Sequence, residues 1–360
     1  MMLTIHTLFN DPNIVNAVIQ RVLQTRKDTI YWQQYLDFRR TTTRVFKDYI
    51  GQVTGVMAGS INSRYGEKPI RERQNIGSGY GEIAYLGDAY QISIDRLSDL
   101  QDLIDKFNAA KPADQVVAMQ EIVNFIYDDY RQVLLAAHKR MDIIVGSLLM
   151  TGEATVKNKD DNAGGVDLLN IELPFKFIKP DTGAKANFIT YLQQQINLLK
   201  PGYGNFQKMI MSRGTFVKNI IGSAEFGDKF KMQLTGNEMY MSTGLITSQL
   251  ASSVFTGIGL PAIEIKEDYV LDQSGKNVQI YADDRITLLP QDKIGYMRFH
   301  TPYEAVDGVP GRNYSQADGD MLISGYKDGN GRYLEYTAEW IPQITSPNLI
   351  VNFDLSTMNA

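Results

Sequence analysis

The stretch DQVVAMQEIVNFIYDDYRQVLLAAHKRMDIIVGSLL, residues 114–149, decides the fold. Its apolar side chains recur in steps of three and four: Val116, Met119, Ile122, Ile126, Tyr130, Val133, Ala137, Met141, Ile144 and Leu148. This is the period of an amphipathic helix, and Pro112 stands where such a helix would start. The length corresponds to a rod of about 54 Å, roughly three times the mean helix. The sequence therefore predicts one long helix.

A coiled coil is the alternative interpretation of so long a helix. The charge pairing at flanking positions that specifies a coiled-coil partner is absent, and Tyr127, His138 and Met141 occupy positions beside the apolar seam. A single helix that packs on its own domain is therefore favoured.

The segment before this helix predicts a short helix and a ribbon. Asp11 and Pro12 have the residue types of an N-cap and first helical position, and the apolar stripe within 12–24 packs either on its own domain or on a neighbouring subunit. Strand-like pieces follow at 29–35, 45–50, 53–57, 82–86 and 89–94. We interpret 45–95 as a two-stranded ribbon, which is not stable alone in water.

The far end of the ribbon is rich in glycine and in charge. Arg64, Lys68, Arg71 and Arg73 alternate with Glu67 and Glu72, and Tyr65 is the aromatic residue among them. A single aromatic side chain and mixed charge are a weak pattern for binding single-stranded nucleic acid. Salt bridges to another subunit are the better interpretation of Arg64, Tyr65, Glu67, Lys68, Arg71 and Arg73.

The remainder of the chain predicts a mixture of strands and helices. We expect a hairpin or loop over 151–166, strands over 168–177, 206–211, 261–266, 278–281, 286–289 and 294–299, and helices over 186–199, 214–224 and 243–256. Pro201-Gly202 is expected to stop the first of these helices, and the turn at 272–275 to join strands 261–266 and 278–281. Residues 306–333 are expected to form loops or a β-flap, followed by terminal strands at 334–340 and 349–355.

Composition excludes several classes of function. The 360 residues are 43% hydrophobic and 21% charged, as in a folded globular protein, and the net charge of −5 is too small to favour whole-surface binding to nucleic acid or an anionic membrane. Without cysteine there is no disulfide, catalytic thiol, zinc–thiolate site or iron–sulfur cluster. Neither a signal peptide nor an 18-residue apolar run is present, so we expect a cytoplasmic site of synthesis and no membrane span.

A search for catalytic or metal-binding motifs is negative. The glycine string 77–81 precedes strand-like residues and is interpreted as a turn, and no phosphate-binding loop or nucleophile elbow occurs. His6, His138 and His300 lack metal-ligand spacing, and Asp328-Gly329-Asn330 fails as a calcium loop at Arg332. The acidic doublets 160–161 and 283–284 are interpreted as solvated turns. We expect no catalytic, cofactor or metal site.

The order of elements resembles the Hong Kong 97-type major capsid fold of tailed phages. Short segments are similar to the lambda-type major capsid protein (capsid protein E) family: Ser63-Arg64-Tyr65-Gly66, Asp95-Arg96-Leu97, Leu149–Ala154, Ile263–Tyr269, Leu288-Leu289-Pro290 with Gly295, Tyr333–Pro342 and Asn348–Leu355. The resemblance implies an α+β fold with an N-terminal arm (1–44), an extended loop (45–95), a peripheral domain with a spine helix (96–185, helix 114–149), an axial domain with a flap (186–344, flap 306–333) and a C-terminal strand that returns to the peripheral domain (345–360).

The resemblance also implies a function. The expectation is a structural, non-enzymatic major capsid protein that assembles as hexamers and pentamers into an icosahedral shell around dsDNA, in the virion and assembled in the host cytoplasm. Its partners would be copies of itself, a scaffolding protein, a portal, a decoration protein and non-specifically contacted DNA, with no membrane and no cofactor. Some relatives carry a Lys–Asn isopeptide cross-link, for which Lys68 is the candidate here. The alternatives are a nanocompartment shell of the same fold and an unrelated α/β enzyme.

Overall fold

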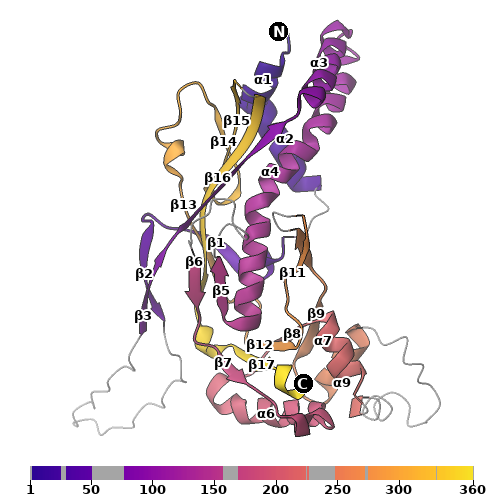
Figure 1. Cartoon of the computed structure of the whole chain (residues 1–360), viewed down its shortest axis with the longest axis vertical. Helices are drawn as coiled ribbons and strands as arrows, with labels where there is room; N and C mark the ends of the chain where they lie inside the picture. Colours follow the sequence, from indigo (N-terminus) through magenta and orange to yellow (C-terminus); the bar gives the residue numbers. More distant parts are fainter. Residues whose placement is uncertain are drawn as a thin grey trace, which may run out of the picture.

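The long helix runs along the long axis of the molecule, with one sheet beside it and a second sheet with helices at its lower end (Figure 1). The structure is a computed structural model that describes residues 2–25, 30–50, 77–156, 169–223, 225–226, 248–271, 275–329 and 331–359. Two hydrophobic cores correspond to the two sheets. Among the described residues no helix is long and apolar enough to cross a membrane.

Helix α4 confirms the prediction from its periodicity. It spans Gln115–Thr151, 37 residues, and it buries the predicted apolar positions from Ile122 to Leu148. The helix ends at Gly152, whose φ of 74° lets its N–H reach the carbonyl of Leu148 at 2.9 Å. A glycine adopts this left-handed conformation without the steric penalty of a Cβ. The helix packs on strands and on helices α2 and α3 of the same chain, not in a coiled coil.

The N-terminal segment belongs to the first core. Helix α1 (Ile5–Asn10), which the sequence analysis did not predict, precedes α2 (Pro12–Thr25), where Asp11 Oδ1 accepts the N–H of Asn13 at 2.9 Å as an N-cap. Val18 and Val22 of α2 are fully buried against the core that contains α4. Of the two partners left open for this apolar stripe, the described contacts are those with its own subunit, and the assignment of 1–44 as an arm stays a prediction.

Residues 30–40 also lie in this core. The predicted strand at 29–35 is wrong, because Trp32–Gln34 form a 3₁₀ turn, η1. The backbone N–H of Trp32 donates to the buried carboxylate of Asp142 at 2.9 Å. Strand β1 (Leu36–Arg40) follows and pairs in parallel with β13 (Gly295–His300).

A six-stranded sheet packs beside α4 and is built around β16 (Gly331–Ile344). Its order is β1-β13-β16-β15-β14, and β4 (Ala84–Ile92) pairs with the other edge of β16. On the opposite edge of β16, β15 (Leu322–Asp328) pairs with residues 331–337 and β13 pairs with residues 339–344. Strand β14 (Tyr314–Gln316) pairs with the outer edge of β15. The expected flap at 306–333 thus contributes two strands of the main sheet.

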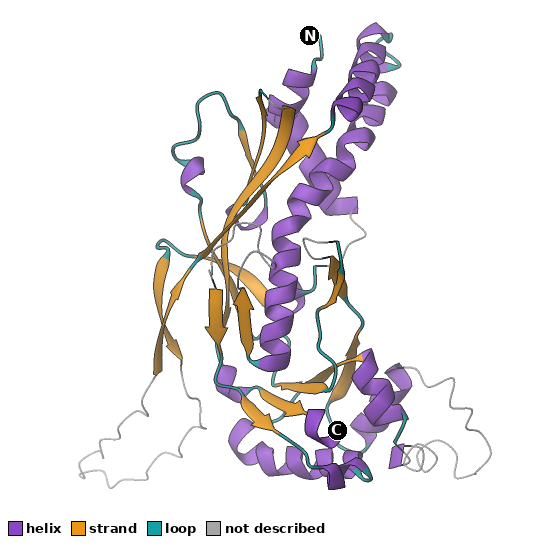
Figure 2. Ribbon diagram, viewed as in Figure 1, coloured by secondary structure: helices purple, strands orange, loops and turns teal. Residues whose placement is uncertain are grey.

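The ribbon is confirmed at its base only. Strand β2 (Val45–Ile50) pairs antiparallel with β3 (Gly77–Glu82), and β4 then leaves the ribbon for the main sheet (Figure 2). The predicted strand at 53–57 and the charged far end lie outside the described residues.

Helix α3 (Ile94–Ala109) is a second element that the sequence analysis missed. Ser93 Oγ accepts the N–H of Arg96 at 3.3 Å and caps the helix, and Leu100 and Ile104 are buried. Two ion pairs join α3 to α4, Arg96–Asp129 at 2.9 Å and Lys106–Glu121 at 2.6 Å.

The second sheet has the order β7-β17-β12-β8-β9. Its strands are β7 (Lys176–Ile178), β17 (Val351–Asp354), β12 (Arg285–Leu289), β8 (Lys208–Ser212) and β9 (Ala262–Lys266). The surrounding helices are α6 (Phe188–Tyr203), α7 (Arg213–Thr215) continued by the π-turn Phe216–Ile221, α9 (Ser248–Gly257) and α10 (Ser356–Asn359). The predicted stop of α6 at Pro201 is wrong, because the last turn of the helix includes it.

The C-terminal strand β17 pairs with β12 and with β7, which lies within the 96–185 range expected to form the peripheral domain, and Val351 and Phe353 fill the core of the second sheet. One strand pairing differs from expectation. The strands at 262–266 and 277–279 are not joined to each other: β9 pairs with β8, and β11 (Asn277–Gln279) pairs with β10 (Tyr269–Leu271). A third small pair, β5 (Glu153–Val156) and β6 (Leu169–Glu172), extends from the end of α4.

A buried polar cluster joins the long helix to the second sheet. Asn352 Nδ2 donates to the carbonyl of Met150 at 2.7 Å and to Thr287 Oγ1 at 2.8 Å. Thr287 Oγ1 in turn donates to the carbonyl of Leu149 at 2.7 Å. These side chains satisfy carbonyls at the helix end that have no partner inside the helix. The two cores are thereby held together by directional bonds as well as by apolar contact.

Candidate assembly surfaces

The six charged or aromatic residues singled out in the ribbon, Arg64, Tyr65, Glu67, Lys68, Arg71 and Arg73, all lie outside the described residues. Their role as assembly contacts stays a prediction. The structure does describe where the ribbon is anchored, and that anchor is the first candidate surface.

The anchor is an ion pair between Arg44 and Glu339. The guanidinium Nη2 lies 2.5 Å from Oε1 and Nε lies 3.2 Å from Oε2 of a carboxylate that is 1% exposed. His300 Nδ1 lies 2.7 Å from Oε2 of the same group. The hydrogen bonds to Glu339 raise the pKa of Arg44 above its ordinary value. A two-point contact of this kind constrains direction as well as distance.

Further polar contacts surround the anchor. Arg40 Nη2 donates to Thr301 Oγ1 at 2.8 Å, and Thr301 Oγ1 donates to Asp320 at 2.5 Å. Tyr85 Oη donates to Glu304 at 3.1 Å, and burial raises the pKa of Tyr85. Strand β4, the end of β1 and the loop after β13 are thus connected next to the ribbon.

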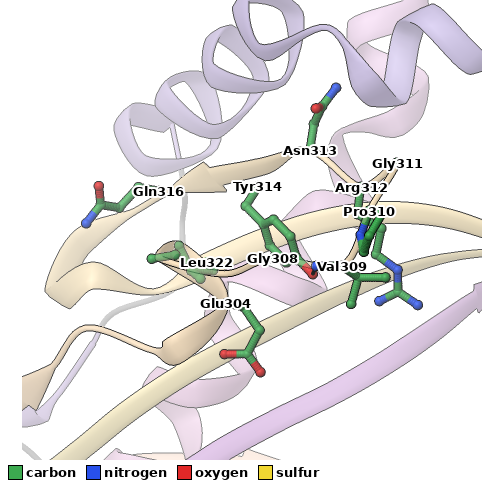
Figure 3. A pocket seen from close by; sticks show the side chains of 11 residues that line it. Glu304, Gly308, Val309, Pro310, Gly311, Arg312, Asn313, Tyr314, Gln316 and Leu322 are labelled. Carbon is green, nitrogen blue, oxygen red and sulfur yellow. Dashed lines mark hydrogen bonds between the residues drawn. The ribbon is translucent and has the colours of Figure 1, made fainter.

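A groove of about 530 Å³ lies on the loop after β13 (Figure 3). Its walls come from Glu304, Gly308–Tyr314, Gln316 and Leu322. Arg312 is already engaged, because it pairs with Glu335 at 2.5 Å and lies 3.7 Å from the centre of the Tyr326 ring. At the adjoining surface Val306 is 84% and Tyr303 60% exposed. The groove offers a mixed surface, and its two charged side chains do not form a pair suited to acid–base catalysis.

Helix α3 presents an acidic face. Asp95, Asp99, Asp102 and Asp105 are exposed and recur at helical spacing. The basic residues of the same helix, Arg96 and Lys106, are paired with carboxylates of α4. The face is therefore acidic, because the basic side chains are turned toward the carboxylates of α4.

The tip of the α3–α4 hairpin is apolar. Val116 and Val117 in the first turn of α4 are 73% and 62% exposed. They adjoin a shallow groove of about 480 Å³ lined by Arg21, Phe107, Gln115, Val116, Met119, Gln120 and Val123. Adjacent exposed valines at the end of the longest helix are a feature of contact surfaces more than of monomer surfaces.

The histidines and acidic residues considered as catalytic or metal-binding candidates take part in packing and hydrogen-bond contacts within the subunit. His138 is buried between Trp32 at 5.8 Å and Trp340 at 4.8 Å between ring centres, and His300 pairs with Glu339, not with the neighbouring Glu304. In the doublet 283–284, Asp283 accepts from Ser212 Oγ at 2.5 Å and Asp284 pairs with Lys218 at 3.2 Å. Across the described ranges no group of three or more carboxylate or imidazole side chains is placed to hold a metal ion.

Comparison with known proteins rests on structure alone, since no family model and no curated protein sequence matches the chain. A protein assigned as the capsid protein of a prophage in E. coli CFT073 superposes with a TM-score of 0.59 at 13% identity, over 96% of this chain and 99% of that one. A phage-related protein from Bordetella bronchiseptica RB50 gives a TM-score of 0.53 at 8% identity, over 96% and 98%. At such identities the likeness concerns the fold. With its spine helix, ribbon and two sheets, this chain has the Hong Kong 97-like major capsid fold.

Proposed function

We propose that the chain is the major capsid protein of a tailed bacteriophage, a structural subunit and not an enzyme. The observation that carries the proposal is the full-length structural likeness to the prophage capsid protein, which includes 96% of this chain and 99% of the other. The exposed apolar tip of α4 and the ribbon that projects from the body supply surfaces that a solitary subunit leaves unused.

The proposed assembly is a closed shell of hexamers and pentamers. Copies of one chain close a shell through repeated heterologous contacts, and subunits with projecting ribbons bury areas on the order of 2,000–5,000 Å² in such contacts. The further proposed partners are a scaffolding protein, a portal, a decoration protein and, at the inner surface, dsDNA bound without sequence specificity. Assembly would take place in the host cytoplasm and end in the virion.

The sheet order suggests how the subunit is divided. We propose that the peripheral part combines the N-terminal helices, α3, α4 and the six-stranded sheet, so that β13–β16 belong to it. The axial part would then contain the second sheet with β17 and helices α6–α10. This division moves 295–344 and the C-terminal strand to the opposite parts from those expected from sequence order.

Electron microscopy of the purified protein tests the shell directly. Closed particles of uniform size, formed by the chain alone or with a co-expressed scaffolding protein, are the expected result. A chain that stays monomeric or dimeric at high concentration under both conditions would contradict the proposal. Particles that exclude nucleic acid and enclose a protein cargo would instead assign the chain to the nanocompartment alternative.

We further propose that the basic residues of the ribbon hold an acidic surface of an adjacent subunit. The acidic face of α3 has the required charge, and its exposed carboxylates recur every three or four residues. Reversing two charges of the ribbon, Arg71→Glu with Arg73→Glu, should prevent shell formation while the subunit keeps its circular dichroism spectrum and unfolding midpoint.

A reciprocal change makes this test specific. Asp99→Lys with Asp102→Lys should impair assembly alone and restore it in combination with the ribbon variant, because the attraction is re-formed with opposite signs. The matched control is Asp128→Lys, an exposed acid on α4 outside that face. If the ribbon variant forms normal shells, the proposed contact of the ribbon with an adjacent subunit is contradicted. If the combined variant fails to assemble, α3 is not the partner of the ribbon.

A further inference from the structure

The direction in which the ribbon leaves the body depends on few attachments. Strand β3 continues into β4 through Ile83, which is 7% exposed, and the N–H of Ile83 donates to the carbonyl of Arg44 at 3.0 Å. The chain also enters the ribbon from β1 through residues 41–44, so two covalent links and one hydrogen bond lie together at the foot of the ribbon. A pair of strands without further neighbours bends and twists readily. A body held only along one line can still rotate about that line, so a further contact is needed to define its angle.

The side chain of Arg44 supplies a further contact. It reaches from the residue before β2 to Glu339, whose carboxylate it binds through Nη2 at 2.5 Å and Nε at 3.2 Å. Glu339 belongs to β16 and faces His300 of β13 on one side and Tyr85 of β4 on the other in the strand register. The far end of the contact is therefore the central strand of the six-stranded sheet, which is paired on both edges.

The surroundings of the carboxylate explain why this contact is specific. Glu339 is 1% exposed, so an ionised group there depends on partners from the protein. Arg44 provides a planar fork that fits both oxygens, whereas His300 reaches one oxygen from within the sheet. Among the described contacts of this carboxylate, those of Arg44 link it to the ribbon, and His300 still reaches Oε2 when Arg44 is replaced.

We propose that Arg44 is a positioning residue that sets the angle of the ribbon relative to the sheet through its two-point bond to buried Glu339. The inference deepens the proposed function, because an oriented ribbon is what a neighbouring subunit would meet. The angle itself is a property of the isolated subunit and is measured without assembly.

Because the sequence contains no cysteine, introduced cysteines are the sole sites that a thiol-reactive spin label modifies. Two cysteines introduced at Asp48 of β2 and at exposed Lys327 of β15 carry spin labels, and the distance between the labels is obtained by pulsed electron spin resonance on the full chain. The expected result for the parent chain is one narrow distance peak. Arg44→Gln should lose that peak and give a broad distribution, while circular dichroism and the unfolding midpoint show that the body remains folded.

Three matched variants separate positioning from a general loss of charge. Arg44→Lys keeps the charge but not the fork, and it should restore part of the narrow peak. His300→Gln leaves the Arg44 bond in place and should keep the peak, as should Arg39→Gln, which removes a nearby arginine that lies 4.8 Å over the Tyr296 ring. An unchanged peak in Arg44→Gln would overturn the inference, and equal broadening in His300→Gln would overturn the specific role of Arg44.

Shell formation by the same variants keeps the two proposals distinguishable. If the parent chain forms no shell but Arg44→Gln broadens the distribution, the proposed function fails and the positioning role stands. If shells form equally well from the parent chain and from a variant with a broad distribution, the ribbon angle is not needed for assembly and the link between the two is overturned.

Discussion

Asp142 is an acidic residue in the middle of an apolar helix face, and its burial has a measurable consequence. The residue is 1% exposed. Its carboxylate accepts a hydrogen bond from the backbone N–H of Trp32 at 2.9 Å and a longer one from Lys139 Nζ at 3.4 Å. Burial raises the pKa of Asp142 to about 6 from 3.8, against the opposing effect of these two donors. The residue therefore holds the turn at 32–34 on the long helix while it resists ionisation.

The stability of the subunit should consequently depend on pH through this group. The folded chain retains the proton more tightly than the unfolded chain, so this contribution to stability is complete below pH 3.8 and is lost as pH rises through about 6. The full difference corresponds to about 3 kcal/mol. Asp142→Asn, which keeps an acceptor for Trp32, should weaken this dependence and should be no less stable than the parent at pH 7.

Thermal unfolding between pH 4.5 and 7.5 measures this effect. The control is Asp128→Asn, an exposed helix residue whose ion pair with Arg131 spans 3.8 Å, which should follow the parent curve. Equal pH dependence in the parent and in Asp142→Asn would show that other groups dominate and would contradict the assignment.

Individual residue roles were predictable from sequence only where the cause is local. Asp11 was recognised as an N-cap because its partner is two residues away. The pairing of Arg44 with Glu339 was not, because 295 residues separate them and no local pattern links the two positions. The same holds for Asn352, whose importance comes from carbonyls at the end of a helix 202 residues earlier. The ribbon residues 64–73 remain predictions from their charge pattern.

Among the elements, the long helix was the most predictable and the short amphipathic ones the least. Helix α4 was recognised because its apolar period continues over ten turns. Helix α3 has a comparable stripe at Leu97, Leu100 and Ile104, but it directly follows a strand whose alternating pattern continues to residue 94 in the sequence. Its cap, Ser93, was a signal in the sequence that would have found it.

Gly146 shows how closely the long helix approaches its neighbours. A Cβ at this position would lie 2.2 Å from Ile280 Cγ2 and 2.7 Å from the backbone oxygen of Ile280. The backbone oxygen cannot yield as the end of a flexible side chain would. The glycine thus permits the β10–β11 region to pack directly on the helix.

Gly146→Ala should therefore destabilise the subunit, although alanine is the better helix former by about 1 kcal/mol. Overpacking against backbone should outweigh that gain, with a net loss of about 1–3 kcal/mol. The matched control is Gly202→Ala in the last turn of α6, where no atom lies within 4 Å of the new Cβ. Chemical denaturation of both variants checks the prediction, and a Gly146→Ala protein as stable as the control would refute the close contact.

For the whole molecule, the N-terminal segment is the part for which the sequence left two packing partners open. An arm that binds a neighbour would leave the isolated subunit stable when its apolar stripe is altered. The structure instead buries Val18 completely between the N-terminal helices and the core of α4. The stripe itself was visible in the sequence, but a stripe does not say which subunit it packs against.

Val18→Asp should consequently unfold the subunit before any assembly step. A charge buried without a partner costs more than 3 kcal/mol in most settings, so the variant should lose its cooperative unfolding transition or accumulate as aggregate. Ala17→Asp, at the adjacent exposed position of α2, should leave the transition unchanged. A folded Val18→Asp monomer that fails only in shell formation would support the arm interpretation.

The division of the chain into sheets was the part of the fold that sequence order predicted least well. Neighbouring segments were assigned to the same domain, whereas β16 pairs with β4 and β17 pairs with β7 across long stretches of chain. Strand pairing of this kind is decided by which apolar faces meet in three dimensions. Alternation identified the terminal strands at 334–340 and 349–355 but not the sheets to which they belong.

The long separation of β4 and β16 in the chain has a consequence for biosynthesis. Strand β4 and Arg44 find their partners in residues 332–340 and in Glu339, which the ribosome makes much later, 295 residues after Arg44 in the case of Glu339. Pairing over such separations is slow and leaves strand edges open in the nascent chain. Prematurely terminated chains lack β16 and cannot complete this sheet. Synthesis of β16 thus becomes a checkpoint that keeps shorter polypeptides from presenting an oriented ribbon.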